Sequence, residues 1–190
     1  MASLDFYRKH LDLLEQRFNS KILSVDFRPK HKGWDKYQLR IQFENGKVYF
    51  MHNYEDSYFS CFAGAHASVR KTCLGCEFKS LHVSDISLAD FWGYKSAGIK
   101  KNKEGLSLIV ANTNKGIDAV EHAENLYTEP LDLKYTDYAF RSKSPAPSEI
   151  KRRNEFFASA RKVGYESAAK PYYDNKLKHI LTYIKVKLKI

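Results

Sequence analysis

Apolar side chains near the start of the chain recur at steps of three and four residues, the spacing that gathers them on one face of a helix. They are Leu4, Tyr7, Leu11, Leu14 and Phe18. The pattern therefore predicts an amphipathic helix over residues 3–18. A short apolar run at residues 22–27 follows, and Pro29 ends it. Because proline cannot continue a strand ladder, we predict a short strand there.

The clearest local pattern lies in the next thirty residues. Apolar and polar residues alternate from Tyr37 to Phe43, which is the period of a half-buried strand. Asn45 and Gly46 follow, and this dipeptide supplies the positive backbone angles of a tight hairpin turn. We therefore predict a β-hairpin whose second strand covers residues 47–51.

Shorter patterns fill the rest of the chain. They predict a helix at 55–63, an irregular loop at 64–83, strands at 86–89, 107–111 and 126–133, and helices at 116–125, 149–162 and 165–173. The segment 142–153, with two prolines and three serines, is predicted to be a linker. The final IKVKLKI alternates as a strand does, but it also fits the end of a longer helix, so both stay open.

Strands and helices mixed in this irregular order indicate an α+β fold. We expect a small mixed or antiparallel sheet that contains the hairpin and is flanked by helices. Residues 1–142 should form one domain, and residues 143–190 a basic, mostly helical extension.

Composition supports a folded protein without a membrane span. Hydrophobic residues make up 43% of the chain and aromatic residues 14%, enough for a core. No window approaches the roughly 18 to 20 apolar residues of a membrane span. The start of the chain is acidic and amphipathic, which argues against a secretory signal and for a cytoplasmic location. Three cysteines cannot all pair within the chain, which also fits a reduced compartment.

The formal net charge of +10 arises from 32 basic and 22 acidic residues, and much of the excess lies beyond residue 150. Such a basic C-terminus suits weak contact with an anionic membrane surface. Tyrosines interleaved with lysines there leave base stacking open as an alternative. Because no nucleic-acid-binding motif accompanies them, we expect no specific nucleic acid partner.

Candidate chemistry is concentrated in RKTCLGCEFKSLHVSDISLADFWG, residues 70–93. Cys73 and Cys76 are spaced to hold one metal ion or two corners of an iron–sulfur cluster. Gly75 between them allows the tight turn that such chelation needs. Three basic side chains flank the pair and favour thiolate over thiol: Arg70, Lys71 and Lys79.

Other interpretations of the cysteine pair stay open. Cys61 and one nearby histidine would complete a four-ligand zinc site with the pair; the candidates are His52, His66 and His82. Both thiols could instead be ordinary buried side chains. A thioredoxin-like exchange site has less support, because the pair lies in a predicted loop and not at the start of a helix.

Three passages in this order resemble the coenzyme F-420 (deazaflavin) hydrogenase/dehydrogenase beta-subunit family, in its C-terminal domain. The first is FRPKHKGW at residues 27–34, which precedes the Asn-Gly hairpin. The second is the stretch 70–93 with its Cys-x-x-Cys, Asp-Ile-Ser and Asp-Phe-Trp-Gly. The third is EGLSLIVANTNKG at residues 104–116. Together they span about half of the chain, and its basic end resembles versions of the family found beside polysaccharide-biosynthesis genes.

The resemblance implies a flavoprotein oxidoreductase that passes electrons between a 4Fe-4S cluster, FAD and a substrate or the deazaflavin coenzyme. Matched position by position, it makes Cys73 and Cys76 cluster ligands. It places five further residues at the wall of the cofactor site or beside its anionic groups: Arg70, Lys79, Asp85, Asp90 and Gly93. It assigns no catalytic residue.

The sequence also departs from the family pattern. Family members carry an upstream ferredoxin-like module with its own cysteines and a glycine-rich flavin-binding region, and this chain contains neither. Lys71 stands where proline is commoner, and Ala89 where glycine is commoner. We therefore expect a fragment, split subunit or degenerate homologue that works with a second chain carrying the missing parts. The alternative is a non-enzymatic scaffold with a structural zinc or no metal.

Overall fold

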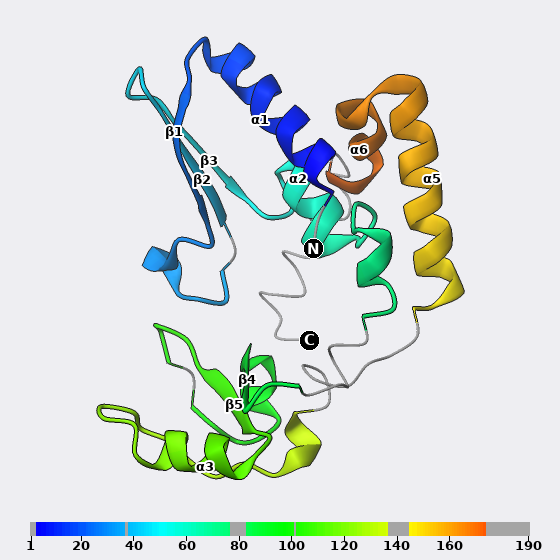
Figure 1. Cartoon of the computed structure of the whole chain (residues 1–190). Coiled ribbons are helices and arrows are strands. Elements are labelled where there is room, and N and C mark those ends of the chain that lie inside the picture. Colours follow the sequence, from blue (N-terminus) through cyan, green and yellow to red (C-terminus); the bar gives the residue numbers. More distant parts are fainter. Residues whose placement is uncertain (1–2, 37, 77–82, 101, 137–144, 174–190) are drawn as a thin grey trace. The chain divides into compact units, whose positions relative to one another are not determined.

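A computed structural model describes residues 3–36, 38–76, 83–100, 102–136 and 145–173. The chain divides into two compact units, shown in Figure 1. The first draws its described residues from Met1–Lys32, Lys36–Leu74 and Pro145–Ile190, and the second from Gly33–Asp35 and Gly75–Ser144. The expected domain boundary after residue 142 stays a prediction.

The first unit opens with helix α1, Leu4–Phe18, which confirms the predicted amphipathic helix. The Ser3 side chain caps the helix by accepting from Phe6 N, and Asn19 ends it in the left-handed region at φ 48°. The buried face presents Phe6, His10 and Leu14.

Helix α1 packs on a three-stranded antiparallel sheet of order β1-β2-β3 (Figure 1). The strands are β1 Ile22–Phe27, β2 Gln38–Phe43 and β3 Val48–His52. Alternate residues of the strands point to the helix, as the two-residue period requires. The shared core consists of Leu14, Leu39, Ile41, Phe43 and Tyr49.

The turn between β2 and β3 corrects one expectation. Gly46 takes a positive φ of 80°, but Asn45 does not. Gly46 N donates to Phe43 O and Phe43 N donates to Lys47 O, each at 3.0 Å, so the loop is one residue longer than a two-residue turn. Asn45 acts through its side chain, which accepts from Lys47 N at 3.1 Å and donates to Phe18 O at 3.0 Å.

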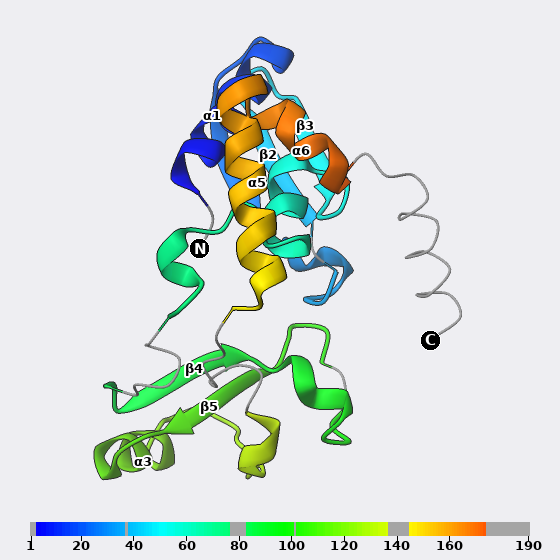
Figure 2. The same cartoon turned by 90° about the vertical axis from the view of Figure 1, so that its right-hand side faces the viewer.

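Helices from distant parts of the sequence complete the first unit. They are α2 Ser57–Phe59, which continues as a π-helical turn over Ser60–Gly64, α5 Pro147–Val163 and α6 Tyr165–Tyr173. Figure 2 shows α5 and α6 side by side, and α6 also contacts α1 and α2. The linker expected at 142–153 is wrong in its second half, because Pro147 begins α5 at a position where proline is favoured.

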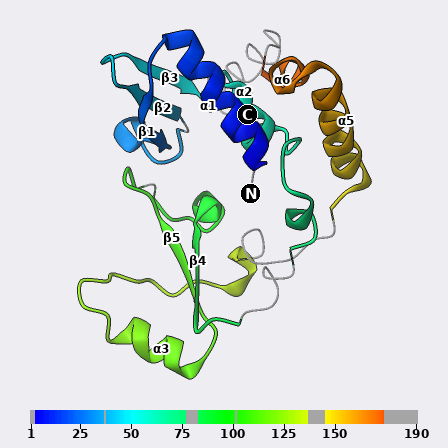
Figure 3. The same ribbon diagram turned by 45° about the horizontal axis from the view of Figure 1, so that its top comes forward.

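The second unit is built on a two-stranded antiparallel ribbon (Figure 3). Its strands are β4 Ile86–Asp90 and β5 Ser107–Ala111, and helix α3, Asn114–Glu121, follows β5. The strand expected at 126–133 is wrong, because residues 126–132 are irregular and a 3₁₀ turn begins at Leu133. Most of that segment is exposed, and Pro130 cannot donate to a ladder.

The fold is therefore α+β, as predicted, with two small antiparallel sheets and a helical C-terminal region. No helix in the described part of the chain is both long enough and apolar enough to cross a membrane. The final IKVKLKI, for which strand and helix stayed open, lies outside the described residues.

Candidate functional site

Cys73, the first thiol of the candidate pair, ends a single 3₁₀ turn over Lys71–Cys73. Two backbone hydrogen bonds close this turn, from Cys73 N to Arg70 O at 3.0 Å and from Leu74 N to Lys71 O at 3.1 Å. The thiol is half-buried and free of any disulfide, while the side chains of Arg70 and Lys71 are exposed. The fold thus places a half-buried thiol on a short turn that also carries two cationic side chains.

Cys76, the second thiol, is likewise half-buried and free of any disulfide. The boundary between the compact units falls between Leu74 and Gly75, so each thiol belongs to its own unit. Gly75 has no positive φ, and a Cβ added there would meet nothing within 4 Å. The conformation of Gly75 in this structure is therefore open to other residues, and its role in a chelating turn stays a prediction. Lys79 lies outside the described residues.

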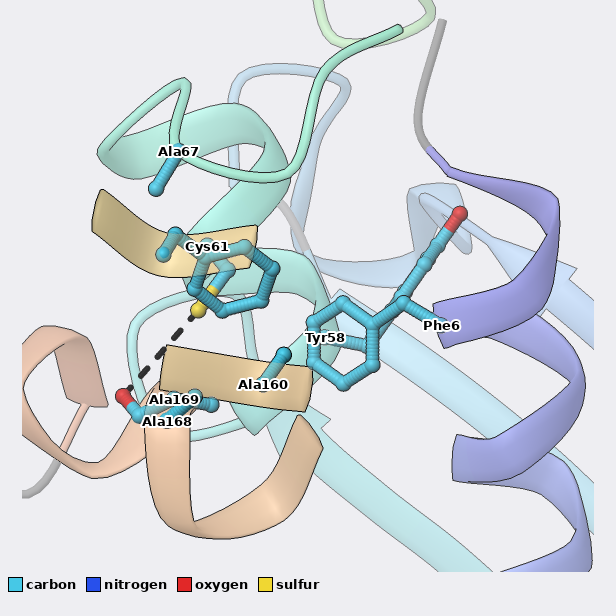
Figure 4. Close-up of a cluster of buried hydrophobic side chains, with 8 residues drawn as sticks. Phe6, Tyr58, Cys61, Ala67, Ala160, Ala168 and Ala169 are labelled. Atoms are coloured by element: carbon cyan, nitrogen blue, oxygen red, sulfur yellow. Dashed lines mark hydrogen bonds between the residues drawn. The ribbon is translucent and has the colours of Figure 1, made fainter. Parts of the chain in front are cut away.

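Cys61 is placed where it cannot join the pair. It is fully buried in the core of the first unit, and its Sγ lies 4.0 Å from Ala169 O of α6 (Figure 4). Burial raises the pKa of this thiol far above its usual range, with smaller contributions from Asp56 and Glu166. Within the described ranges, no three histidine, cysteine, aspartate or glutamate side chains are grouped to hold a metal ion. The zinc site that used Cys61 is therefore not supported.

Asp85, a predicted wall residue, lies at the corner that precedes β4. Its Oδ1 accepts from Thr113 Oγ1 at 2.6 Å, and its Oδ2 lies 3.4 Å from Lys115 Nζ. The hydrogen bond from Thr113 and the contact with Lys115 lower the pKa of Asp85. Its backbone oxygen accepts from Asn112 N at 2.8 Å. The carboxylate thus joins the start of β4 to the start of α3.

Gly116 makes this corner possible. A Cβ added at residue 116 would collide with Asp85 O and lie 2.8 Å from the Asp85 carbonyl carbon. Asn112 crosses the same corner, because its Nδ2 donates to Ser84 O at 3.0 Å and to Ser87 Oγ at 2.8 Å. The Asp-Ile-Ser and Asn-Thr-x-x-Gly motifs, distant in sequence, therefore meet through their polar groups and a glycine contact.

The remaining motif, residues 27–34, contacts the other end of the ribbon through Trp34. Trp34 and Trp92 are stacked with ring centroids 4.1 Å apart, and Trp34 is only 2% exposed. Gly105, at φ 113°, lies against the Trp34 ring, where a Cβ would approach to 3.3 Å. Phe91, Tyr94 and Leu108 complete this buried cluster. All three motifs of the sequence thus contribute to the frame of the second unit.

Asp90 and Gly93 lie at this second end. Asp90 is the exposed last residue of β4, opposite Ser107 of β5. Gly93 lies in the 3₁₀ turn Trp92–Lys95, and its carbonyl accepts from Ala97 N at 3.2 Å. About five residues of extended chain separate Asp85 from Asp90, a span of about 16 Å. The structure therefore places the predicted wall residues along the ribbon and does not cluster them.

Sequence reasoning missed a buried polar network in the first unit. Ser57 Oγ lies 3.3 Å from His10 Nδ1, and His10 Nε2 lies 2.9 Å from Asp56 Oδ2. This is the order of a hydrolytic triad, but the three side chains are at most 4% exposed. The Ser57 hydroxyl donates to Glu166 of α6 at 2.9 Å. The network therefore ties α1, α2 and α6 together and presents no accessible nucleophile.

No sequence signal indicated these contacts, because they join residues up to 109 positions apart. Polar residues buried at a helix interface have the same spacing as polar residues on a surface, so periodicity does not separate them. The Trp34–Trp92 stack has a weak signal, since both tryptophans lie in quoted motifs.

Comparison with known proteins gives one result. No curated protein and no solved structure matches the chain. Residues 2–134 match the family model for the C terminus of the beta subunit of coenzyme F420 hydrogenase/dehydrogenase, which indicates a redox function of the beta-subunit kind. This matched region contains the cysteine pair and the three motifs that frame the second unit. The chain therefore belongs to the family of C-terminal domains of coenzyme F420 hydrogenase/dehydrogenase beta subunits.

Proposed function

We propose that this chain is part of an FAD- and iron–sulfur-dependent oxidoreductase and is incomplete without a partner chain. In this proposal Cys73 and Cys76 supply ligands to a 4Fe-4S cluster. The observation that carries it is a pair of half-buried cysteines outside any disulfide, three positions apart, inside the region that matches the family. Cysteines that form no disulfide also fit a reduced compartment such as the cytoplasm.

The ligand count explains why a partner is needed. A 4Fe-4S cluster is held by four cysteine thiolates, and the pair supplies half of them. The third cysteine of the chain, Cys61, is enclosed in a separate core and is not available. The residues therefore fit the group in part, and the remaining ligands come from a chain that carries the ferredoxin-like and flavin-binding parts. When bound, the cluster supplies single-electron transfer between FAD and a substrate or deazaflavin.

The wall residues suit an extended ligand better than a compact one. Asp85 and Asp90 lie at opposite ends of β4, about 16 Å apart, so one small group cannot contact both. A dinucleotide such as FAD is long enough to lie along the ribbon. In this proposal Thr113 and Lys115 hold Asp85 in place, and the cationic Arg70 and Lys79 lie near anionic sulfur or phosphate.

Iron uptake tests this function. The chain is reconstituted anaerobically with iron and sulfide, with and without the partner chain, and bound iron and flavin absorbance are measured. We expect the complex to bind cluster iron, and both Cys73→Ser and Cys76→Ser to lose most of it. The matched control, Cys61→Ser, should bind as much iron as the natural chain.

Absence of iron and flavin from both preparations would remove the redox proposal. Zinc at one ion per chain, in protein purified from cells, would instead favour the scaffold alternative.

A further inference from the structure

Helix α5 lies beyond residue 134, where the family match ends, yet it contacts the loop that leads to Cys73. Arg152 Nη1 donates to Ala65 O at 2.8 Å, and Arg153 Nε donates to Val69 O at 2.8 Å. Both hydrogen bonds are partly buried and join residues more than 80 positions apart. Figure 1 shows α5 running alongside the segment that follows α2.

The two hydrogen bonds lie on either side of His66, which takes a left-handed φ of 54° just after the π-helical turn ends. The backbone of the loop also closes here, because Ala67 N donates to Cys61 O at 2.8 Å. Ala65 precedes His66 in the sequence and Val69 follows it by three residues. The carbonyl of Ala65 accepts from Arg152, and the carbonyl of Val69 accepts from Arg153. Charged donors make the stronger class of hydrogen bond. The pair of arginines therefore adds charged hydrogen bonds from α5 to a loop that neutral backbone hydrogen bonds also hold.

The second arginine is itself fixed in place. The guanidinium of Arg153 lies 4.7 Å from the centroid of the Phe157 ring, and Phe157 packs against the core of the first unit. Because the side chain is stacked, it needs little further ordering to hold Val69 O. Cys73 follows Val69 by four residues, and all of these groups belong to the first unit.

We propose that Arg152 and Arg153 are positioning residues, through which α5 sets the conformation of residues 65–73 and so the presentation of Cys73. The helix would then be an addition beyond the family domain that acts on the cysteine site of that domain. We call the hydrogen bonds of Arg152 to Ala65 O and of Arg153 to Val69 O the clamp, and the clamp follows from these contacts. Its role in positioning Cys73 for cluster ligation rests on the proposed function.

The clamp is tested on the full chain without any cofactor. Amide hydrogen exchange of residues 66–74 and the alkylation rate of Cys73 are measured for Arg153→Leu, Arg152→Leu and the double variant. We expect each single change to raise both rates about tenfold, and the double change to raise them further. Arg161→Leu, an exposed substitution on the same helix, is the matched control and should leave both rates unchanged.

A conservative variant separates the hydrogen bond from a general loss of packing. Lysine at position 153 keeps a cationic donor that can reach Val69 O, so Arg153→Lys should restore most of the protection. The proposed clamp is wrong if residues 66–74 exchange as fast in Arg153→Lys as in Arg153→Leu. It is also wrong if these residues exchange in the double variant at the rate of the natural chain.

Iron uptake by the complex then distinguishes the two proposals. We expect the double variant to retain less iron than the natural chain, which would support positioning for ligation. Normal iron retention beside fast exchange would overturn positioning for ligation. If the natural complex takes up no iron, the proposed function fails, while the exchange and alkylation results still decide the clamp.

Discussion

Replacing Gly116 with alanine is expected to lower the free energy of unfolding of the second unit by about 2–3 kcal/mol. The new Cβ would collide with Asp85 O, and this oxygen belongs to backbone that the Asn112 N–H already holds at 2.8 Å. Neither side of the contact is a flexible side-chain end, so the corner between β4 and α3 must open. Urea denaturation gives the change in stability, and hydrogen exchange in β4 and β5 gives its location.

The expected loss of stability is opposite in sign to the usual effect of replacing a helical glycine with alanine. Gly116 lies inside α3, and within a helix alanine is favoured over glycine by about 1 kcal/mol. Without the contact, Gly116→Ala should therefore stabilise the protein. Gly75→Ala is the matched control, because a Cβ there meets nothing within 4 Å, and it should change stability by less than about 0.5 kcal/mol. A stabilised Gly116→Ala variant would show that the corner is not packed as described.

Asp56→Ala is expected to lower the free energy of unfolding of the first unit by about 3–5 kcal/mol. Asp56 is fully buried and caps α2, accepting from Phe59 N at 2.6 Å. It also accepts from Tyr49 OH at 2.8 Å and lies 2.9 Å from His10 Nε2. Removing the carboxylate leaves several buried groups without their acceptor, which is far costlier than losing an exposed cap. Thermal and urea unfolding measure the loss.

Asp132→Ala is the matched control for this prediction. Asp132 also caps a short turn, accepting from Lys134 N at 3.0 Å, but its side chain is 56% exposed. Its replacement should lower the free energy of unfolding far less, because water can take the place of an exposed cap. Equal losses for Asp56→Ala and Asp132→Ala would contradict the buried network.

The same carboxylate should make stability depend on pH. Burial by itself would raise the pKa of Asp56, but His10, Phe59 N and the Tyr49 hydroxyl outweigh it and hold the pKa below the ordinary 3.8. A lowered pKa in the folded state means that this stabilisation is complete above pH 3.8 and is lost as the pH falls through the folded value. Asp56→Asn should remove this acid-dependent contribution, since it cannot ionise.

Local patterns are enough to predict most elements of the fold. The spacing of Leu4 to Phe18 locates α1, and alternation locates the hairpin, because both depend on periodicity alone. Asn45 and the segment 126–133 depart from expectation for one reason: their conformations depend on long-range contacts. Asn45 holds Phe18 O, and residues 126–132 have no strand to pair with in the described part of the chain.

The candidate site could be predicted in its residue types but not in its geometry. The sequence alone identifies the Cys-x-x-Cys and Asp-Ile-Ser motifs. Only the fold shows that Asp85 accepts a hydrogen bond from Thr113 and that Asp90 lies at the far end of β4. Arginines in a basic helix look alike in sequence, so nothing marked Arg152 and Arg153 as loop contacts. Such contacts arise from tertiary packing, which residue spacing does not encode.

The most direct test asks whether iron bonds to the sulfur position of residue 73. Selenocysteine is placed at this position, the complex with the partner chain is reconstituted anaerobically, and X-ray absorption is recorded at the selenium edge. Our account predicts iron bonded directly to the selenium atom, and the same result for position 76. Selenium bonded to carbon alone at both positions, in a complex that has taken up iron and sulfide, would contradict it.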